Sequence, residues 1–122
     1  MSGPSEHDEQ ASLIQEANLR AGADPRWGLL LAIPNGGLRS KATAAKLKAE
    51  GVRAGVPDLF LPVASRGMHG LWIEMKRGDG GQISAAQKEW HIALQAQGYG
   101  VAICPGADSA VWAIRMYLDG AA

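Results

Sequence analysis

The sequence has little cysteine, few aromatic residues and no excess of either charge: its 122 residues include one cysteine and one phenylalanine, and the formal net charge is zero. The single Cys104 excludes an intrachain disulfide, and because it ends an apolar run we expect it to be buried and unreactive. Zero net charge excludes a global basic field, so a nucleic-acid partner would have to meet a local patch. No apolar run approaches the length of a membrane span, and no histidine or cysteine cluster has zinc-site spacing.

The remaining composition is that of an ordinary globular domain, with 47% hydrophobic and 20% charged residues. A chain of this length predicts one domain over residues 1–122, with residues 1–4 as a loose tail. The first ten residues are polar and acidic and do not resemble a signal peptide. Together with the lone cysteine, this leads us to expect a cytoplasmic location.

Two stretches, residues 58–63 and 71–76, alternate apolar and polar side chains with a period of two. This alternation is typical of half-buried strands. The seven residues between them, 64–70, have the glycine content of a hairpin loop. The sequence therefore predicts an antiparallel hairpin whose loop is centred near Arg66.

In that register Phe60 faces Trp72 and Asp58 faces Glu74, with Lys76 beside Glu74 on the same face. Paired strands lie about 4.8 Å apart, so both carboxylates can reach one cation. Like charges this close repel unless a cation lies between them, and magnesium prefers oxygen ligands of this kind. The alternative is a surface salt bridge between Glu74 and Lys76, which would contribute about 0–1 kcal/mol and leaves Asp58 unexplained.

Patterns elsewhere predict the other elements of the fold. These are a helix from Ser5 to about Gly22, an apolar strand over 27–33, a short helix over 41–49, a helix over 84–97, a strand over 99–104 and a last helix over 110–118. The strand–helix–strand run between 71 and 104 predicts a right-handed crossover and a parallel strand pair. The element order α-β-α-β-β-α-β-α predicts an α/β fold with a small mixed sheet flanked by helices.

The helix over 84–97 carries two polar residues whose roles are open. Ser84 and Gln87 form a capping-box pattern, and capping alone would account for Gln87. The expected apolar face consists of Trp90, Ala93 and Leu94. His91 lies one turn after Gln87, and because a helical histidine is more often a packed or exposed residue, it receives no role.

The first helix begins with acidic residues that have two explanations. Glu6 shares a face with Gln10 and Leu13 by three-and-four spacing, and Glu9 lies slightly off that face. Composition favours acids that simply stabilise the positive end of the helix. The functional alternative places Glu6 or Glu9 at the edge of the metal site.

Basic residues gather just before the predicted hairpin, at Arg39, Lys41, Lys46, Lys48 and Arg53. Such a run is either a solvated face or a surface that positions phosphates, and we give the two equal weight. Asn35, next to a glycine pair, is expected at a left-handed turn position, with a backbone phosphate contact as the alternative.

Pro57-Asp58 followed by Glu74-Met75-Lys76 matches the Pro-Asp…(Asp/Glu)-x-Lys signature of the PD-(D/E)XK nuclease superfamily. The surrounding residues resemble the VRR-NUC family of virus-type replication and repair nucleases. They are Ile33-Pro34-Asn35-Gly36-Gly37, residues 51–59, Ile73 to Arg77, Ser84 with Gln87, and Gly98-Tyr99. The resemblance runs from about Glu6 to Leu118, which implies a stand-alone nuclease domain of the phage and prophage type.

This resemblance implies a restriction-endonuclease-like core and a DNA endonuclease site dependent on Mg²⁺ or Mn²⁺. Asp58 and Glu74 match the metal ligands, and the main-chain carbonyl of Met75 commonly adds another. Lys76 matches the motif lysine, and Gln87 matches the glutamine of the following helix. A family glutamate commonly precedes a glutamine by four residues in the N-terminal helix; Glu6 before Gln10 fits that spacing, with Glu9 as the substitute.

Stand-alone members are similar to Holliday-junction resolvases, which act as homodimers on branched DNA. We therefore expect a structure-specific DNA endonuclease that takes part in DNA repair or a related process. Two alternatives remain open. One is a flap, nicking or restriction-type nuclease of the same fold. The other is a non-catalytic DNA-binding or protein-interaction module, which the neutral net charge mildly favours.

Overall fold

The computed structural model of the chain describes residues 3–34, 40–78 and 81–119. Its elements are α1 (Glu6–Arg20), η1 (Pro25–Leu29), β1 (Leu31–Ala32), α2 (Lys41–Ala49), β2 (Leu59–Leu61), β3 (Leu71–Lys76), α3 (Ala85–Ala96), β4 (Gly100–Pro105) and α4 (Ala107–Asp119). The strands form one sheet in the order β1-β2-β3-β4. The β1–β2 and β2–β3 pairs are antiparallel and β3–β4 is parallel, which confirms the predicted mixed sheet and crossover.

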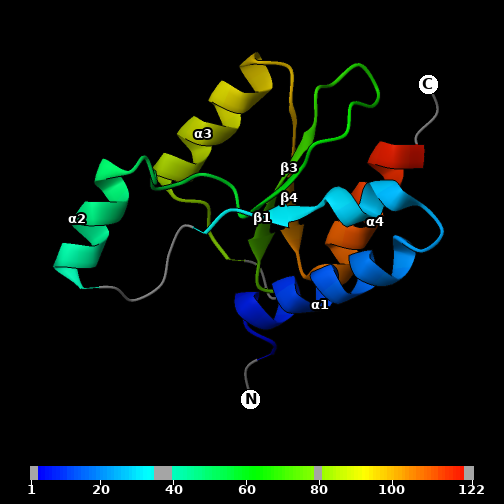
Figure 1. The fold of residues 1–122 in the computed structure, drawn as a ribbon, viewed down its shortest axis with the longest axis horizontal. Coiled ribbons are helices and arrows are strands. Elements are labelled where there is room, and N and C mark those ends of the chain that lie inside the picture. The colour runs from blue at the N-terminus through cyan, green and yellow to red at the C-terminus, as the bar shows by residue number, and fades with distance from the viewer. Residues whose placement is uncertain (1–2, 35–39, 79–80, 120–122) are drawn as a thin grey trace.

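Helices cover both faces of this sheet (Figure 1). Helices α1 and α4 pack together on one face, α3 lies on the other, and α2 stands apart from the sheet. Helix α2 buries none of its residues, whereas α1 and α4 bury apolar stripes against the strands. In the parts of the chain that the structure describes, no helix is long and apolar enough to cross a membrane.

One apolar core lies between the sheet and the α1–α4 pair. Its centre is formed by fully buried aliphatic side chains: Leu13, Leu59, Leu61, Ile73, Met75 and Ile114. Burying one such side chain stabilises the fold by about 1.5–3 kcal/mol relative to leaving it in water. Cys104 belongs to this core as expected, and burial raises the pKa of its thiol to about 11. The opposite face of β3 is therefore left for the polar residues of the strand.

The β2–β3 hairpin has the predicted register. Phe60 pairs with Trp72 and their rings stack with centroids 4.3 Å apart, while Leu59 pairs with Ile73. The turn is made by Arg66 and Gly67, which both have positive φ, at 54° and 77°. Two such residues give the backbone twist that a tight hairpin needs. One apolar and one polar face thus follow from the same register.

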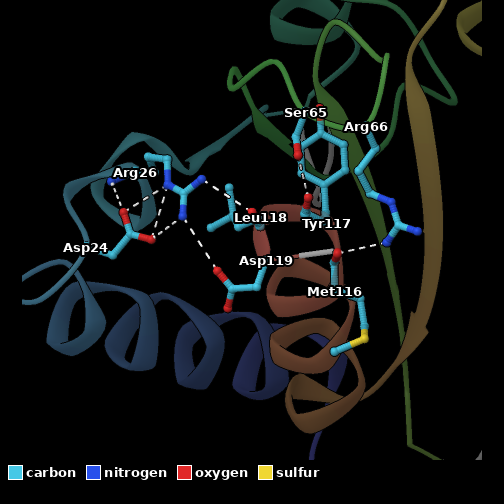
Figure 2. Close-up of polar contacts among 8 residues, drawn as sticks. All are labelled: Asp24, Arg26, Ser65, Arg66, Met116, Tyr117, Leu118 and Asp119. Carbon is cyan, nitrogen blue, oxygen red and sulfur yellow. Dashed lines mark hydrogen bonds and ion pairs between the residues drawn. The ribbon is translucent and has the colours of Figure 1, made fainter. Parts of the chain in front are cut away.

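The C-terminal end of α4 is held by side chains from elsewhere in the chain (Figure 2). The last carbonyls of a helix have no intrahelical amide to bond. Those of Met116, Tyr117 and Leu118 accept hydrogen bonds from Arg66 (2.9 Å), Ser65 (2.6 Å) and Arg26 (3.4 Å), in that order. The hairpin loop and η1 are both anchored to α4 in this way.

The strand predicted over residues 27–33 is wrong for most of its length. Only Leu31–Ala32 pairs with β2, and Pro25–Leu29 forms a 3₁₀ helix instead. Asp24 caps this turn by accepting from the Arg26 amide, and Pro25 occupies a first-turn position where its missing N–H costs nothing. Buried Trp27, under the guanidinium of Arg20, gives the turn its apolar anchor.

Candidate active site

The loop before β2 follows a path that only glycine permits. Gly55 has φ +90°, and a Cβ there would lie 2.8 Å from the carbonyl carbon and oxygen of Ala86 on α3. The indole of Trp90 on the same helix donates a 3.1 Å hydrogen bond to the Ala54 carbonyl. The loop is thereby pressed against the start of α3, and it delivers buried Pro57 and then Asp58 to the edge of β3.

Asp58 is tied to the strand that carries Glu74. Its Oδ2 accepts a 2.7 Å hydrogen bond from the Met75 amide, and its own carbonyl accepts from Ile33. The N–H and C=O of one strand residue point toward the same neighbouring strand. The Met75 carbonyl is therefore directed toward the β2 side of the sheet, where Asp58 lies.

Glu74 is a buried acid with 1% of its surface exposed. Its Oε2 accepts a hydrogen bond from Gln87 Nε2 at 3.2 Å, and its Oε1 lies 3.2 Å from His91 Nε2. Burial is the main cause that raises the pKa of Glu74 to about 8, followed by the hydrogen bond and the charge of the Asp58 carboxyl. The Lys76 ammonium opposes this rise. Asp58 and Glu74 thus stand close enough to disfavour the doubly ionised pair.

Gln87 connects this acid to Lys76. The Lys76 side chain is buried, and its Nζ donates to Gln87 Oε1 at 3.3 Å. The same Oε1 accepts from the Ser84 amide at 2.8 Å, in a capping box that confirms the predicted start of α3. Because the cap fixes the amide oxygen, Gln87 can present its Nε2 only toward Glu74. Gln87 therefore caps α3 through its Oε1 and contacts Glu74 through its Nε2 in one side-chain conformation.

His91 is the residue that sequence reasoning missed. It is the buried residue of α3, with 7% exposure, whereas Ala93 of the expected apolar face is exposed and Trp90 and Leu94 are half-buried. Burial and the Lys76 charge lower the pKa of His91. The available signal was its spacing of four residues from Gln87, which places both on one helix face.

The two acids of α1 have different surroundings. Glu9 Oε2 accepts a hydrogen bond from the Ala107 amide at the start of α4, and it fills the space above Gly106, which has φ +96°. The Gly106 amide in turn donates to the Lys76 carbonyl at 3.0 Å. Exposed Glu6 is one of the charges that raise the pKa of Glu74. Glu9 therefore holds α1 to α4. Glu6 lies within electrostatic reach of the acidic pair formed by Asp58 and Glu74.

The basic residues lie on the part of the chain between β1 and β2. Lys41, Lys46 and Lys48 are exposed on α2, and Arg53 is exposed in the loop that follows. Asn35 and Arg39 lie outside the described residues. Helix α2 is capped at its N-terminus by Ser40, whose hydroxyl accepts a hydrogen bond from the Thr43 amide.

The oxygen atoms around Asp58 and Glu74 fit a divalent cation. A positive ion beside Asp58 would favour the ionised form of Glu74, whose pKa is raised by burial and by the neighbouring Asp58 carboxyl, and hard cations take carboxylate and carbonyl oxygens. In the described ranges, no three His, Cys, Asp or Glu side chains are already grouped to hold a metal ion. Further ligands would have to come from the Met75 carbonyl, from water or from a rotated Glu6 side chain.

Comparison with known proteins gives a match to a domain family and matches to solved structures. The VRR-NUC domain matches residues 6–108 of the chain. A solved structure described as "VRR_NUC domain protein" superposes with a TM-score of 0.82 at 29% sequence identity, covering 96% of this chain and 90% of that chain. A search of curated proteins found no match to this chain.

Proposed function

This chain belongs to the VRR-NUC domain family of nucleases, and we propose that it is a metal-dependent DNA endonuclease that hydrolyses phosphodiester bonds. The observation that carries the proposal is the placement of Glu74 and Lys76 on the polar face of β3. Both are buried, and both are held by Gln87 beside the Asp58 carboxylate. Burying two ionisable groups costs free energy, and a fold retains such a cluster most readily for chemistry.

Asp58, Glu74 and the main-chain carbonyl of Met75 would hold the ion. Glu6 would complete the ligand set directly or through water, since Glu9 is engaged by the Ala107 amide. A bound Mg²⁺ or Mn²⁺ supplies positive charge against the scissile phosphate and lowers the pKa of a water molecule. The chain contributes by presenting Asp58 from the residue before β2 and Glu74 from β3, and the hydrogen bond from the Met75 amide to Asp58 keeps the two acids together.

Lys76 would orient the attacking water or stabilise negative charge in the transition state. Its ammonium is held 3.3 Å from Gln87 Oε1, which keeps it beside Glu74 rather than in solvent. Gln87 acts on both groups at once, because its other terminal atom donates to Glu74. The products would be a 5′-phosphate and a 3′-hydroxyl, as in similar nucleases.

The substrate we propose is branched DNA, with a four-way (Holliday) junction as the first candidate. The exposed basic residues of α2 and the following loop would contact phosphates without reading bases, as would Asn35 and Arg39. A homodimer would present two active sites to a junction of two-fold symmetry. Recognition would then depend on DNA shape more than on sequence.

The test is cleavage of a labelled four-way junction with added Mn²⁺, beside linear, nicked and flapped DNA of the same sequence. The wild type should cut the junction best, and Lys76→Ala should lose cleavage while circular dichroism shows an intact fold. Preferred cutting of the flapped or the nicked DNA would identify that DNA structure, in place of the junction, as the substrate. Binding supported by Ca²⁺ with no cleavage in Mg²⁺ or Mn²⁺ would indicate a non-catalytic module, and wild-type cleavage by Glu74→Ala would refute the site.

A further inference from the structure

We propose that His91 is a positioning residue that holds the Glu74 carboxylate in the orientation that receives the metal ion. This inference rests on the proposed function, because it concerns the same acidic pair. It adds a residue that lies outside the Pro-Asp…Glu-x-Lys signature and outside the capping box.

The contacts define a clamp on Glu74 from a single helix. Gln87 and His91 are four residues apart on α3, so their side chains lie on one face in adjacent turns. Gln87 Nε2 is 3.2 Å from Glu74 Oε2, and His91 Nε2 is 3.2 Å from Glu74 Oε1. Each carboxylate oxygen therefore has its own partner on α3. Together the two contacts fix the rotation of the carboxylate about its Cγ–Cδ bond.

The charge state of Glu74 decides what His91 must do. A carboxylate that binds a cation is ionised and can only accept hydrogen bonds. The His91 ring must then present Nε2–H, which selects one tautomer of the neutral imidazole. With one lone pair of each oxygen occupied by α3, the remaining lone pairs are available toward Asp58 and the β2 side.

Burial makes the contact between His91 and Glu74 hard to replace. His91 is 7% exposed and Glu74 is 1% exposed, so water cannot readily replace the ring as a donor to Oε1. Loss of the donor would leave a buried carboxylate oxygen without a partner and free to turn toward Lys76. Partners that orient metal ligands typically change metal affinity by about 10–100-fold when removed.

The experiment is a calorimetric titration of Mn²⁺ into the metal-free protein, with no DNA present. His91→Leu retains bulk but removes the donor, and we expect its dissociation constant for Mn²⁺ to rise about 10–100-fold. His91→Gln places an amide N–H near the position of Nε2 and should recover most of that loss. A purely packing role for His91 predicts the opposite ranking, with Leu tolerated and Gln harmful.

Two results would overturn the proposal: His91→Leu that binds Mn²⁺ as tightly as the wild type, or His91→Gln that is no better than His91→Leu. Glu74→Gln serves as the reference variant. If Glu74→Gln loses Mn²⁺ binding while His91→Leu retains it, only the role of His91 fails. If Glu74→Gln itself binds Mn²⁺ like the wild type, the metal site of the proposed function fails, and the His91 proposal fails with it.

Discussion

The Asp58 carboxylate accepts a 2.7 Å hydrogen bond from the amide of Met75, the residue that follows Glu74 on the neighbouring strand. One acid of the candidate site is therefore fixed to the backbone that carries the other. The register of β2 against β3, together with this hydrogen bond, sets the separation of the two carboxylates. Substitutions of Asp58 or Glu74 should consequently change the electrostatics of the site more than the packing of the core.

The first prediction is that the metal-free protein loses stability as pH rises through the neutral range. The pKa of Glu74 is about 8 in the fold and 4.5 ordinarily, so between these values the folded chain holds a proton that the unfolded chain lacks. This contribution is full below the unfolded pKa and falls by about 1.4 kcal/mol per pH unit until the folded pKa is reached. Urea unfolding across this range should show the slope in the wild type, and Glu74→Gln should lack it. Parallel pH profiles would contradict the prediction.

The second prediction concerns protons and the metal ion. Since a cation binds the ionised carboxylates, binding at neutral pH should release about one proton per site. Calorimetric titrations of Mn²⁺ in two buffers with different ionisation enthalpies should therefore give different apparent enthalpies. The difference should diminish at pH values above the Glu74 pKa of about 8, where the proton has already left. Buffer-independent enthalpies at neutral pH would indicate that Glu74 is not part of the site.

The hairpin was predictable because its information is local. Period-two alternation and a loop of fixed length leave one register in which Phe60 meets Trp72, and the structure has that register. The placement of Asp58 opposite Glu74 follows from the same pairing. The crossover helix was predictable for a similar reason, since Ser84 and Gln87 form the capping box that the sequence spells out.

Other features depend on contacts between segments far apart in the chain. The commitment of Glu9 to the Ala107 amide spans 98 residues, and no pattern near Glu9 encodes it. The burial of His91 depends on the polar face of β3 lying under α3, which spacing within the helix does not reveal. The 3₁₀ turn at Pro25 replaced an expected strand because Trp27 found a buried position that only tertiary packing defines.

The third prediction separates the two acids of α1. Glu9→Ala removes a charged acceptor from the Ala107 amide, so the free energy of unfolding should fall by about 1–3 kcal/mol. Glu6→Ala removes an exposed side chain, so the free energy of unfolding should change by less than about 0.5 kcal/mol. We expect Glu6→Ala, and not Glu9→Ala at a temperature where it is folded, to weaken Mn²⁺ binding. The reverse pattern in metal titration would assign the helix carboxylate to Glu9.

The fourth prediction compares two glycines of the loop that leads to Asp58. Gly55 and Gly51 both have positive φ, at +90° and +102°, but a Cβ on Gly55 would meet the Ala86 backbone at 2.8 Å whereas one on Gly51 meets nothing within 4 Å. Both Ala substitutions carry backbone strain of about 1–3 kcal/mol. Gly55→Ala should cost about 1–3 kcal/mol more because the loop must move away from α3. Denaturant unfolding of the two variants measures this difference directly, and equal losses would show that the close approach to Ala86 does not constrain the loop.

The last prediction tests the basic surface of α2. Helix α2 has no buried residue, and Lys46 and Lys48 are exposed, so changing either to Gln should leave folding almost unaffected. If each contacts a phosphate, the slope of log binding constant against log salt should become shallower by about 0.9 per substitution on duplex DNA. Arg115→Gln is the matched control, because this exposed residue lies on α4, which packs on the opposite face of the sheet from α3. Fluorescence anisotropy with labelled junction DNA at several salt concentrations gives the slopes. An unchanged slope for both lysine variants, or an equal effect of Arg115→Gln, would exclude α2 as the phosphate-contacting surface.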